Sequence, residues 1–455
     1  MVETQTKNQN VFWLWSNKVD WVERGDVSYW LPQYEEVAEI LNKTNSRPLA
    51  DLSEIITKGE TPRTKGDVYV EAGVPFIRVT NISEEGIKTE DLVKISQYTH
   101  SRLKRSIIKP NDIVFSMAGT IGVATVISDE INEANINQAV TKIRLKKEIN
   151  PVYVSTFLNS KYGRLQSLRF AGGGVQKNID FHEIKRIRIF LPTPQEQRKV
   201  EQIVKEAFQL KKEAEADYQK AQQLLNEAMG LIDVGKKQEL SFWRWSDEID
   251  IIARIDPDYY RKGYIQLAKS KSIKLEPLSK FIVDYSGGYT FETEKYLPSG
   301  IPIIRIKDLN YPEVKKPEDA FFADLPEFQR FTAKPDDILI SMSGTIGLSA
   351  IIPKELSKCY VNQRITAITT KGINRFYLLA FLNSSFYREE LEKIGTGGVQ
   401  TNVSYKQIVS LPIPRLGDKE ETIGNLLRGF IEKNKESRQK FQEAKDFVEN
   451  LVKKG

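Results

Sequence analysis

The sequence has very little cysteine and histidine, which removes several classes of protein from consideration. Among its 455 residues Cys359 is the only cysteine, and His100 and His182 are the only histidines. One cysteine can form neither an internal disulfide framework nor a thiolate cluster around a metal ion. We therefore expect no His/Cys metal site and a reducing, cytoplasmic environment.

The sequence also lacks long apolar runs and segments of low complexity. Residues 1–10 are polar and contain no apolar core after a basic start, and no stretch approaches 18 uninterrupted apolar residues. Secretion and membrane spanning are therefore not expected. The hydrophobic fraction of 40% and the charged fraction of 28% are ordinary for a chain that folds throughout.

Motifs for catalysis or for cofactor binding are missing as well. No G-x-x-x-x-G-K-[ST] phosphate loop occurs, and no glycine-rich turn is followed by the acidic residue of a nucleotide site. The segment IDPDYY (255–260) faintly resembles the Pro-Pro-Tyr/Phe motif of adenine methyltransferases but lacks the second proline. Asp336 and Asp337 have no companion Glu-x-Lys of a nuclease site, and a solvated turn explains them better. We expect a protein that is not an enzyme and has no cofactor.

The charge and the length of the chain favour two domains and a polyanionic partner. A single core usually stops growing near 250 to 300 residues, so 455 residues predict at least two domains. The net charge is +6, and residues 47–194 hold 22 Lys and Arg against 16 Asp and Glu. Residues 195–230 are close to neutral, so the positive excess lies outside that segment. Scattered lysines that aid solubility would explain the excess equally well.

The sequence contains an internal duplication. FWLWS (12–16) recurs as FWRWS (242–246), and DIVFSMAGTIG (112–122) recurs as DILISMSGTIG (337–347). Further pairs keep the same order; they are VPFIR (74–78) with IPIIR (301–305), Asn-Gln (137–138) with Asn-Gln (362–363), FLNS (157–160) with FLNS (381–384), and GGVQKN (173–178) with GGVQTN (397–402). An ordered set of this kind indicates a tandem repeat.

Each repeat ends in a long helical pattern. The first runs from about 195 to 230, has Gly230 as a stop signal and carries a heptad stripe of Val200, Ile203, Ala207, Leu210, Ala214, Ala221, Leu224 and Ala228. The second runs from about 418 to 453, with Ile423, Leu426, Phe430, Ala444, Phe447 and Leu451 on its apolar face; Lys433 and Lys440 interrupt one row. Two-fold pseudo-symmetry predicts that these helices pack side by side and antiparallel.

The bodies between the helices mix short β-branched runs, Gly/Pro/Asn turns and shorter helices, such as 152–168 and 375–391. We therefore predict an α/β (α+β) fold of two similar domains with mixed sheets, separated by two long antiparallel coiled-coil helices. The expected boundaries are 1–194 for the first domain, 195–230 for the first helix, 231–417 for the second domain and 418–455 for the second helix. A helix of about 35 residues is roughly 50 Å long, which exceeds one turn of B-DNA.

Two repeated glycine-containing motifs are candidate DNA contacts. The turns SMAGTIG (116–122) and SMSGTIG (341–347) permit positive φ and close backbone approach, which suits phosphate contact through N–H groups and a threonine hydroxyl. In AGGGVQKN (171–178) and GTGGVQTN (395–402), glutamine and asparagine suit base edges, and Lys177 suits a phosphate. A tight turn between strands explains the first motif about as well, and a helix stop explains the glycines of the second.

This ordered set resembles the specificity subunits of type I restriction-modification systems. The resemblance covers residues 12–451 and includes PTPQEQ (192–197) leading into a long helix, although the second copy departs from it with LGDKEE (416–421). It implies that each body is a target-recognition domain reading half of a split, asymmetric site in double-stranded DNA. It also implies that two methyltransferase subunits dock on the helices and nearby surfaces, that restriction subunits join them, and that methylation, ATP hydrolysis and cleavage belong to those partners.

The loops 58–65 and 286–295 begin the two bodies at equivalent places but carry different side chains, so we expect them to read different bases. Glycines 59 and 287 are the expected counterparts. The candidate DNA-binding residues are Thr61, Arg63, Lys65, Arg78, Ser116, Thr120, Asn137, Gln138, Gln176, Lys177 and Asn178 in the first body, and Tyr289, Thr290, Arg305, Lys307, Ser341, Thr345, Asn362, Gln363, Gln400 and Asn402 in the second.

Two other functions compete with this interpretation. A methyltransferase or nuclease with its own DNA-reading repeats would need a cofactor or metal motif, and the purified chain would methylate or cut DNA alone. A duplicated scaffold that binds proteins would use the same glycine loops but would not bind DNA in a salt-dependent way.

Overall fold

The structure, a computed structural model, describes residues 26–62, 69–89, 91–172, 177–230, 273–395 and 402–455. These residues form two compact units. Unit 1 contains the described residues up to Leu210 together with Glu436–Gly455, and unit 2 contains Lys211–Lys435. The candidates Arg63, Lys65, Gln176 and Gln400, both tryptophan motifs and IDPDYY lie outside the described residues.

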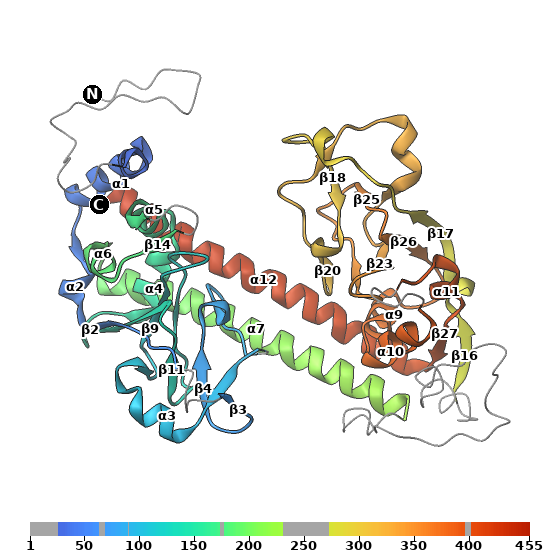
Figure 1. Ribbon diagram of the computed structural model, residues 1–455, viewed down its shortest axis with the longest axis horizontal. Coiled ribbons are helices and arrows are strands. Elements are labelled where there is room, and N and C mark those ends of the chain that lie inside the picture. Colours follow the sequence, from blue (N-terminus) through green and yellow to red (C-terminus); the bar gives the residue numbers. More distant parts are fainter. Residues whose placement is uncertain (1–25, 63–68, 90, 173–176, 231–272, 396–401) are drawn as a thin grey trace. The chain divides into compact units, whose positions relative to one another are not determined.

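Unit 1 is built on two sheets. The main sheet has the order β10-β9-β12-β2, and the second sheet has the order β3-β7-β4-β11-β8 (Figure 1). The strands of these sheets are β2 Ser53–Lys58, β3 Tyr69–Val70, β4 Val74–Ile77, β7 Val93–Ile95, β8 Ile107–Ile108, β9 Ile113–Ser116, β10 Ala124–Val126, β11 Ala134–Ile136 and β12 Val140–Leu145. Short pairs complete the unit: β1 Ser46–Pro48 with β15 Arg188–Phe190, β5 Ile82–Ser83 with β6 Gly86–Ile87, and β13 Ala171–Gly172 with β14 Asn178–Ile179.

The main sheet of unit 1 is buried on both faces. Successive side chains of a strand point to opposite faces, and Ile113 and Phe115 of β9 pack on the helical side with α4 Pro151–Asn159 and α5 Lys161–Phe170. Val114 packs on the opposite side with the second sheet. This explains why β9 is apolar at consecutive positions. The remaining helices of the body are α1 Pro32–Lys43, α2 Leu49–Leu52, α3 Gln97–Arg102 and α6 Phe181–Arg186.

Unit 2 repeats this plan. Its main sheet has the order β17-β26-β23-β24-β20-β19, and its second sheet has the order β21-β18-β25-β22. The strands are β17 Ile282–Gly287, β18 Ile301–Ile304, β19 Leu309–Asn310, β20 Glu313–Val314, β21 Phe321–Phe322, β22 Thr332–Ala333, β23 Ile338–Ser341, β24 Ser349–Ile351, β25 Cys359–Val361 and β26 Ile365–Thr370, with a separate pair of β16 Lys274–Pro277 and β27 Pro412–Arg415.

The burial of unit 2 follows the same alternation. Ile338 and Ile340 of β23 pack with the helices, which are α9 Arg375–Leu382, α10 Ser385–Ile394 and α11 Tyr405–Ser410. Leu339 packs on the opposite side with the second sheet. In both units one strand of the second sheet pairs in parallel, β11 with β4 and β25 with β18, while most other pairs are antiparallel. Each unit therefore contains a mixed sheet, as predicted, whereas the main sheet of unit 1 is antiparallel throughout.

The two long helices are α7 Pro194–Ala228 and α12 Asp418–Lys454, and each contributes to both units. In unit 1 the Ser437 hydroxyl donates to the Ala207 carbonyl (2.8 Å) and Lys440 pairs with Glu206 (3.1 Å). In unit 2 Lys433 pairs with Asp217 (2.8 Å). Along the contact, the residue numbers of α7 increase in the direction in which those of α12 decrease. The two helices therefore run antiparallel within each unit. Gly230 follows α7 with φ +68°, as expected of a helix stop.

The predicted stripes were partly right: Val200, Ile423 and Leu451 are buried, whereas Leu210, Ala228 and Phe430 are only half-buried. Ala207, Ala214 and Ala221 are fully buried, but Leu225 is buried more deeply than the predicted Leu224. On α12 the fully buried positions include Leu427 and Val448 rather than Leu426 and Phe447. An α-helix drifts about 20° per heptad relative to a strict seven-residue repeat. Each helix end also packs on a body, which widens the buried stripe.

The lysines that interrupt the predicted stripe lie beside the helix contact. Lys433 pairs with Asp217 and Lys440 pairs with Glu206 and Glu443 across or along the helices. Their stems cover the apolar contact while their charged ends remain paired with carboxylates. The interruption therefore adds ion pairs to the rim of the contact.

The shorter helices were predicted as single segments, and this was wrong. Residues 152–168 divide into α4 and α5, and residues 375–391 divide into α9 and α10. The break falls at the asparagine and serine of FLNS in each unit. Asn159 accepts from the Ala124 backbone N–H (2.9 Å), and Asn383 accepts from that of Ser349 (3.1 Å). The motif therefore turns the chain and ties the helix end to a strand.

The tandem repeat of two α/β bodies with two long antiparallel helices confirms the predicted fold class. Within the described ranges, no helix is both long enough and apolar enough to cross a membrane.

Candidate nucleic-acid interface

The repeated motifs meet at one end of the main sheet in unit 1. The end of β2, the end of β9, and the starts of β10 and β12 lie at the same end because neighbouring strands run antiparallel. This end carries residues 59–61, 116–122 and 137–138, and residues 177–179 join them through β14. We call these four segments, and their counterparts in unit 2, the motif edge.

Backbone hydrogen bonds hold the motif edge of unit 1 together. The Gly59 N–H donates to the Val140 carbonyl (2.8 Å), and the Met117 N–H donates to the Ala139 carbonyl (2.9 Å). The Ile179 N–H donates to the Met117 carbonyl (3.0 Å), which attaches the end of the glycine loop to the turn. The position of each segment therefore depends on main-chain atoms, which leaves its exposed side chains free to differ.

Unit 2 has the same arrangement, made of residues 288–290, 341–347, 362–363 and 402–403. The Tyr289 N–H donates to the Val361 carbonyl (2.9 Å), as the Glu60 N–H donates to the Ile136 carbonyl (3.1 Å) in unit 1. The Met342 N–H donates to the Arg364 carbonyl (2.8 Å), and the Val403 N–H donates to the Met342 carbonyl (2.9 Å). The four motifs that recur in the sequence therefore recur as one constellation.

A glycine in each unit allows the first segment to approach the Asn-Gln segment. A Cβ atom on Gly59 would lie 2.2 Å from the Asn137 carbonyl oxygen, and one on Gly288 would lie 1.9 Å from that of Asn362. Real Cβ contacts are never this short, so only glycine fits. The counterpart of Gly59 is Gly288 rather than Gly287, because Gly287 has no neighbour within 4 Å of an added Cβ. The predicted pairing of these loops was one residue out of register.

The S-x-x-G-T-I-G turns use their serines internally. Ser116 and Ser341 are buried; the Ser116 hydroxyl donates to the Thr120 carbonyl (2.5 Å), and the Ser341 hydroxyl donates to that of Thr345. Both glycines of each turn have positive φ, between +69° and +81°. Thr120 and Thr345 are exposed at the tips. These threonines and the loop N–H groups are the parts of the turn that a ligand can reach.

The Asn-Gln segments place the glutamines outward. Gln138 is exposed, and its backbone N–H lies 3.5 Å from the Thr61 hydroxyl. Gln363 is exposed, and its side-chain oxygen accepts from the Thr290 hydroxyl. Asn137 and Asn362 are half-buried; the Asn362 side chain accepts from the Arg364 N–H (3.4 Å), and among the described residues the Asn137 side-chain oxygen has no partner. Threonine and glutamine are therefore neighbours in both units.

The described ends of the glycine loops are also exposed. Lys177, Asn178 and Asn402 all face solvent, and Asn178 and Asn402 form bridges to Ala118 and Ser343 of the turns. Tyr289 at this edge of unit 2 is 37% exposed, and its ring contacts Phe291, Phe328 and Phe331.

Arg78, Arg305 and Lys307 are engaged with protein groups. The Arg78 guanidinium donates to the Asp91 carbonyl (2.8 Å), and Arg305 pairs with Asp308 (3.2 Å). Arg305 and Lys307 both bind Asp319, and these contacts lower the pKa of Asp319 to about 2. Arg78 and Arg305 begin equivalent 3-10 turns, Val79–Asn81 and Ile306–Asp308, which accounts for their recurrence in the sequence.

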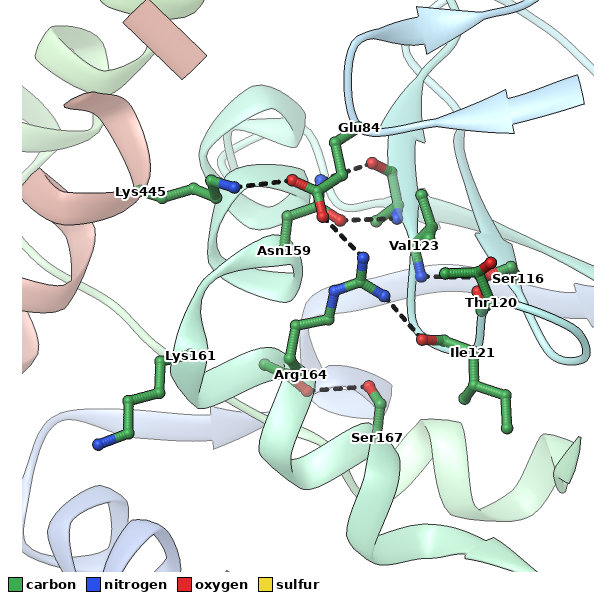
Figure 2. A network of polar contacts seen from close by, with 12 residues as sticks. Glu84, Ser116, Thr120, Ile121, Val123, Asn159, Lys161, Arg164, Ser167 and Lys445 are labelled. Atoms are coloured by element: carbon green, nitrogen blue, oxygen red, sulfur yellow. Dashed lines mark hydrogen bonds and ion pairs between the residues drawn. The ribbon is translucent and has the colours of Figure 1, made fainter. Parts of the chain in front are cut away.

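A network behind the motif edge of unit 1 escaped the sequence analysis (Figure 2). The Arg164 guanidinium donates to the Ile121 carbonyl of the turn (2.7 Å) and pairs with Glu84 (2.7 Å). Glu84 also pairs with Lys445 of α12 (2.9 Å). An arginine follows FLNS at the same spacing in both repeats, as Arg164 and Arg388. This recurrence was the feature of the sequence from which the role of Arg164 could have been predicted. Glu84 carries no such signal, because its partners lie 80 and 361 residues away.

Glu84 remains charged in this network. Burial alone would raise its pKa, but the hydrogen bonds and charges of Lys445 and Arg164 outweigh burial and lower the pKa below its usual value of 4.5. The three side chains are between 21% and 29% exposed, so solvent only partly screens their attraction. The network connects the turn at the motif edge to the long helix of the same unit.

In unit 2 the body contacts the long helices through a different kind of interaction. The N–H of Lys315 donates to the Asp308 carbonyl (2.8 Å), as that of Lys88 donates to the Asn81 carbonyl (2.8 Å), so Tyr311 stands where unit 1 has Glu84. The Tyr311 ring contacts Tyr218 of α7, whose ring in turn contacts Phe430 of α12. Aromatic packing in unit 2 therefore replaces the ion pairs of unit 1.

Metal-ligand clusters and accessible thiols are two features that a catalytic site can use. Within the described ranges, no group of three or more His, Cys, Asp and Glu side chains could hold a metal ion. Cys359 is buried, and burial raises its pKa to about 12, so its thiol is not a nucleophile near neutral pH. Exposed amides, hydroxyls and a lysine on a rigid backbone suit recognition.

Two segments of the chain, residues 42–224 and 274–445, match the family model described as the type I restriction modification DNA specificity domain. Together they cover most of the chain, and each contains one motif edge.

Three relatives illustrate the similarity. The EcoBI specificity subunit of Escherichia coli is 27% identical over 140 residues, which are 30% of this chain and 29% of that subunit. The MjaVIII specificity subunit of Methanocaldococcus jannaschii is 21% identical over 415 residues, which are 87% of this chain and 88% of that subunit. The crystal structure of the type I S subunit from M. genitalium has 13% identity and a TM-score of 0.45, and the match covers 91% of this chain and 96% of that one.

We predict opposite outcomes for alanine at two neighbouring glycines. Gly288→Ala places a methyl group against the Asn362 carbonyl and should lower the free energy of unfolding of unit 2 by about 1 to 3 kcal/mol. Gly287→Ala enters open space and should change it by less than about 0.5 kcal/mol. Urea unfolding, with hydrogen exchange of the Tyr289 and Gln363 amides, measures both. Equal effects would contradict the close approach.

A second prediction concerns the network of Glu84. Glu84→Gln leaves Lys445 and Arg164 without a carboxylate and should lower the free energy of unfolding of unit 1 by about 1 to 3 kcal/mol at pH 7. Glu85→Gln is the matched control; Glu85 lies 3.6 Å from the largely exposed Arg438, so its loss should cost under about 0.5 kcal/mol.

The pH dependence follows from the lowered pKa of Glu84. A carboxylate whose pKa is lower in the folded protein contributes stability that is complete above its usual pKa of 4.5 and is lost as the pH falls through the folded value. The difference between the native protein and Glu84→Gln should therefore shrink below about pH 4.5. Urea unfolding at pH 7 and pH 4 tests this, and a difference that stays constant would show that Glu84 is not held as a carboxylate.

Proposed function

The chain belongs to the type I restriction modification DNA specificity family, and on this premise we propose that each of its two bodies reads one half of a bipartite, asymmetric DNA site. Specificity subunits recognise DNA and do not catalyse, so this chain is the DNA-recognition component of its restriction-modification complex. The observation that carries the proposal is the occurrence of one motif edge in each unit, with the same backbone frame and different side chains.

The motif edge suits both parts of DNA recognition. The exposed tips of the turns offer backbone N–H groups and the hydroxyls of Thr120 and Thr345, and Lys177 offers a charge; these groups suit phosphates, which carry no sequence information. The exposed amides of Gln138 and Gln363 can donate to and accept from a base edge in the major groove. The frame would then position the protein while the exposed side chains choose the bases.

The long helices would separate the two reading domains and recruit the catalytic subunits. We propose recognition domains at 1–194 and 231–417 and spacer helices at 195–230 and 418–455. Two methyltransferase subunits would dock on the helices and the adjacent domain surfaces, and restriction subunits would join this assembly. Methylation, ATP hydrolysis and cleavage would take place on those partners.

The modular reading predicts the outcome of a domain exchange. Residues 47–194 are replaced by the corresponding body of a relative that has an acidic residue at the position of Glu84. The ion pair between the body and Lys445 of α12 is then kept. Methylated adenines are then mapped across the genome of a host that also expresses the methyltransferase subunit. We expect one half of the site to change and the other half to stay the same.

A matched exchange of the body of unit 2 serves as the control, and it should change the opposite half only. A change of both halves after either exchange would contradict the proposal that the domains read independently.

The helices should also set the gap between the two half-sites. Insertion of four residues in both helices, after Leu210 and after Lys435, leaves each unit intact because these are the points where the chain passes between units. Four residues add about 6 Å and leave a net turn of about 40°. One base pair adds about 3.4 Å and turns the duplex by about 35°. We expect the preferred gap to grow by one or two base pairs with both half-site sequences unchanged.

Insertion of two residues at the same points is the control. It turns each helix by about 200° and places the apolar stripes on either side of the insertion on opposite faces. This smaller insertion should abolish methylation of any bipartite site. Methylation mapping of both variants decides the matter, since an unchanged gap with full activity after the four-residue insertion would rule out a spacer role.

A further inference from the structure

The two units differ at an exposed position of the backbone frame that they share. In the motif edge a close-approach glycine, one variable residue and a threonine follow one another, and the variable residue is Glu60 in unit 1 and Tyr289 in unit 2. Their backbone N–H groups donate to equivalent carbonyls, those of Ile136 and Val361 (3.1 Å and 2.9 Å). Equivalent hydrogen bonds place the two residues alike, so the chain contains its own comparison between two reading domains.

Glu60 is fixed by its backbone but not by its side chain. The Gly59 N–H donates to the Val140 carbonyl (2.8 Å), and the next threonine contacts Gln138. The Glu60 side chain is exposed, and in the part of the chain that the structure describes it forms no hydrogen bond or ion pair. The backbone of Glu60 is therefore fixed next to Thr61, which contacts Gln138, and the Glu60 carboxylate is exposed to solvent.

A free carboxylate is costly on a surface that receives DNA. It repels phosphates, and it repels the acceptor atoms that guanine and thymine present in the major groove. In the major groove only exocyclic amino groups can donate a hydrogen bond to a carboxylate. The pairing typical of glutamate is with the N4 amino group of cytosine. An exposed carboxylate at this place is therefore suited to a base that presents an amino group in the major groove.

We propose that Glu60 is a specificity-determining residue, whose carboxylate accepts a hydrogen bond from the N4 amino group of a cytosine in the half-site read by unit 1. This inference rests on the proposed function and names one base pair of the site. It assigns no charged base-contacting residue to this position of unit 2. The equivalent residue, Tyr289, has no carboxylate, and its ring is packed against Phe291, Phe328 and Phe331.

The test uses the complex of the full chain with the methyltransferase subunit of its system. The complex selects from DNA duplexes randomised over the recognised site, and sequencing of the bound pool gives the preference at each position. The native complex should require a C·G pair at one position of one half-site. Glu60→Gln should reduce the discrimination there by about 5- to 150-fold and leave the other half-site unchanged. Glu60→Lys should shift the preference at that position to guanine, whose O6 and N7 accept from lysine.

Glu148→Gln is the matched control. Glu148 is an exposed glutamate that follows the far end of β12, so it removes the same charge from unit 1 at the opposite end of the sheet. It should raise the affinity for all sequences slightly and alter no base preference. Thermal unfolding of each variant should match the native chain, since neither side chain has a described partner.

The outcomes separate the two claims. If the native complex selects a bipartite site and Glu60→Gln keeps the same preferences, the role of Glu60 is wrong while the proposed function stands. If Glu60→Gln changes affinity by the same factor for every sequence, as Glu148→Gln does, Glu60 acts only through charge and the inference fails. If the native complex selects no bipartite site, both the proposed function and this inference are overturned.

Discussion

The structure depends on the two long helices that its units share, because neither repeat completes the core of its own unit. The core of unit 1 includes Val200 and Ile203 of α7, which follow its body in sequence, and also Ala444 and Val448 of α12 from the other repeat. The core of unit 2 is completed in the same way by Ala221 and Leu225 of α7, together with Ile423 and Leu427 of α12. Removing either helix would expose apolar side chains in both units. Both long helices are therefore structural members of both halves.

This constraint explains the composition of the helices. A helix that contacts a body on one side and a second helix on another needs small residues where the helices come closest, and Ala207, Ala214 and Ser437 are buried there. Larger residues such as Phe441 and Phe430 contact rings of α7, those of Phe208 and Tyr218, and also pack against the core of their unit. The attachment of each body then adds its own chemistry, which is an ion-pair network around Glu84 in unit 1 and aromatic packing around Tyr311 in unit 2. The two bodies can differ in this way while keeping one backbone frame.

In the motif edge, the groups that maintain the backbone frame are different from the exposed side chains that a ligand can reach. Hydrogen bonds between main-chain atoms, close-approach glycines and internal serines maintain the frame, and none of them uses an exposed side chain. An exposed residue between these fixed points, such as Glu60, can change without disturbing the fold, whereas the Tyr289 ring also packs against neighbouring aromatic rings. A domain that must acquire new base preferences without refolding benefits from this division of labour.

The sequence alone was sufficient for the duplicated plan, the long helices and the membership of the four motifs in one set, because repeats, heptad spacing and glycine signals are local or periodic. It predicted the short β-branched strands and the stop at Gly230 for the same reason. The division of each shorter helix at FLNS depended on tertiary structure, because Asn159 and Asn383 bond to strands 35 and 34 residues away. The register of Gly59 with Gly288, the internal use of Ser116 and the partners of Glu84 likewise arise only when distant segments come together. Periodicity predicts which face of an element is buried, whereas the partner of a single polar side chain is decided by the packing of the whole unit.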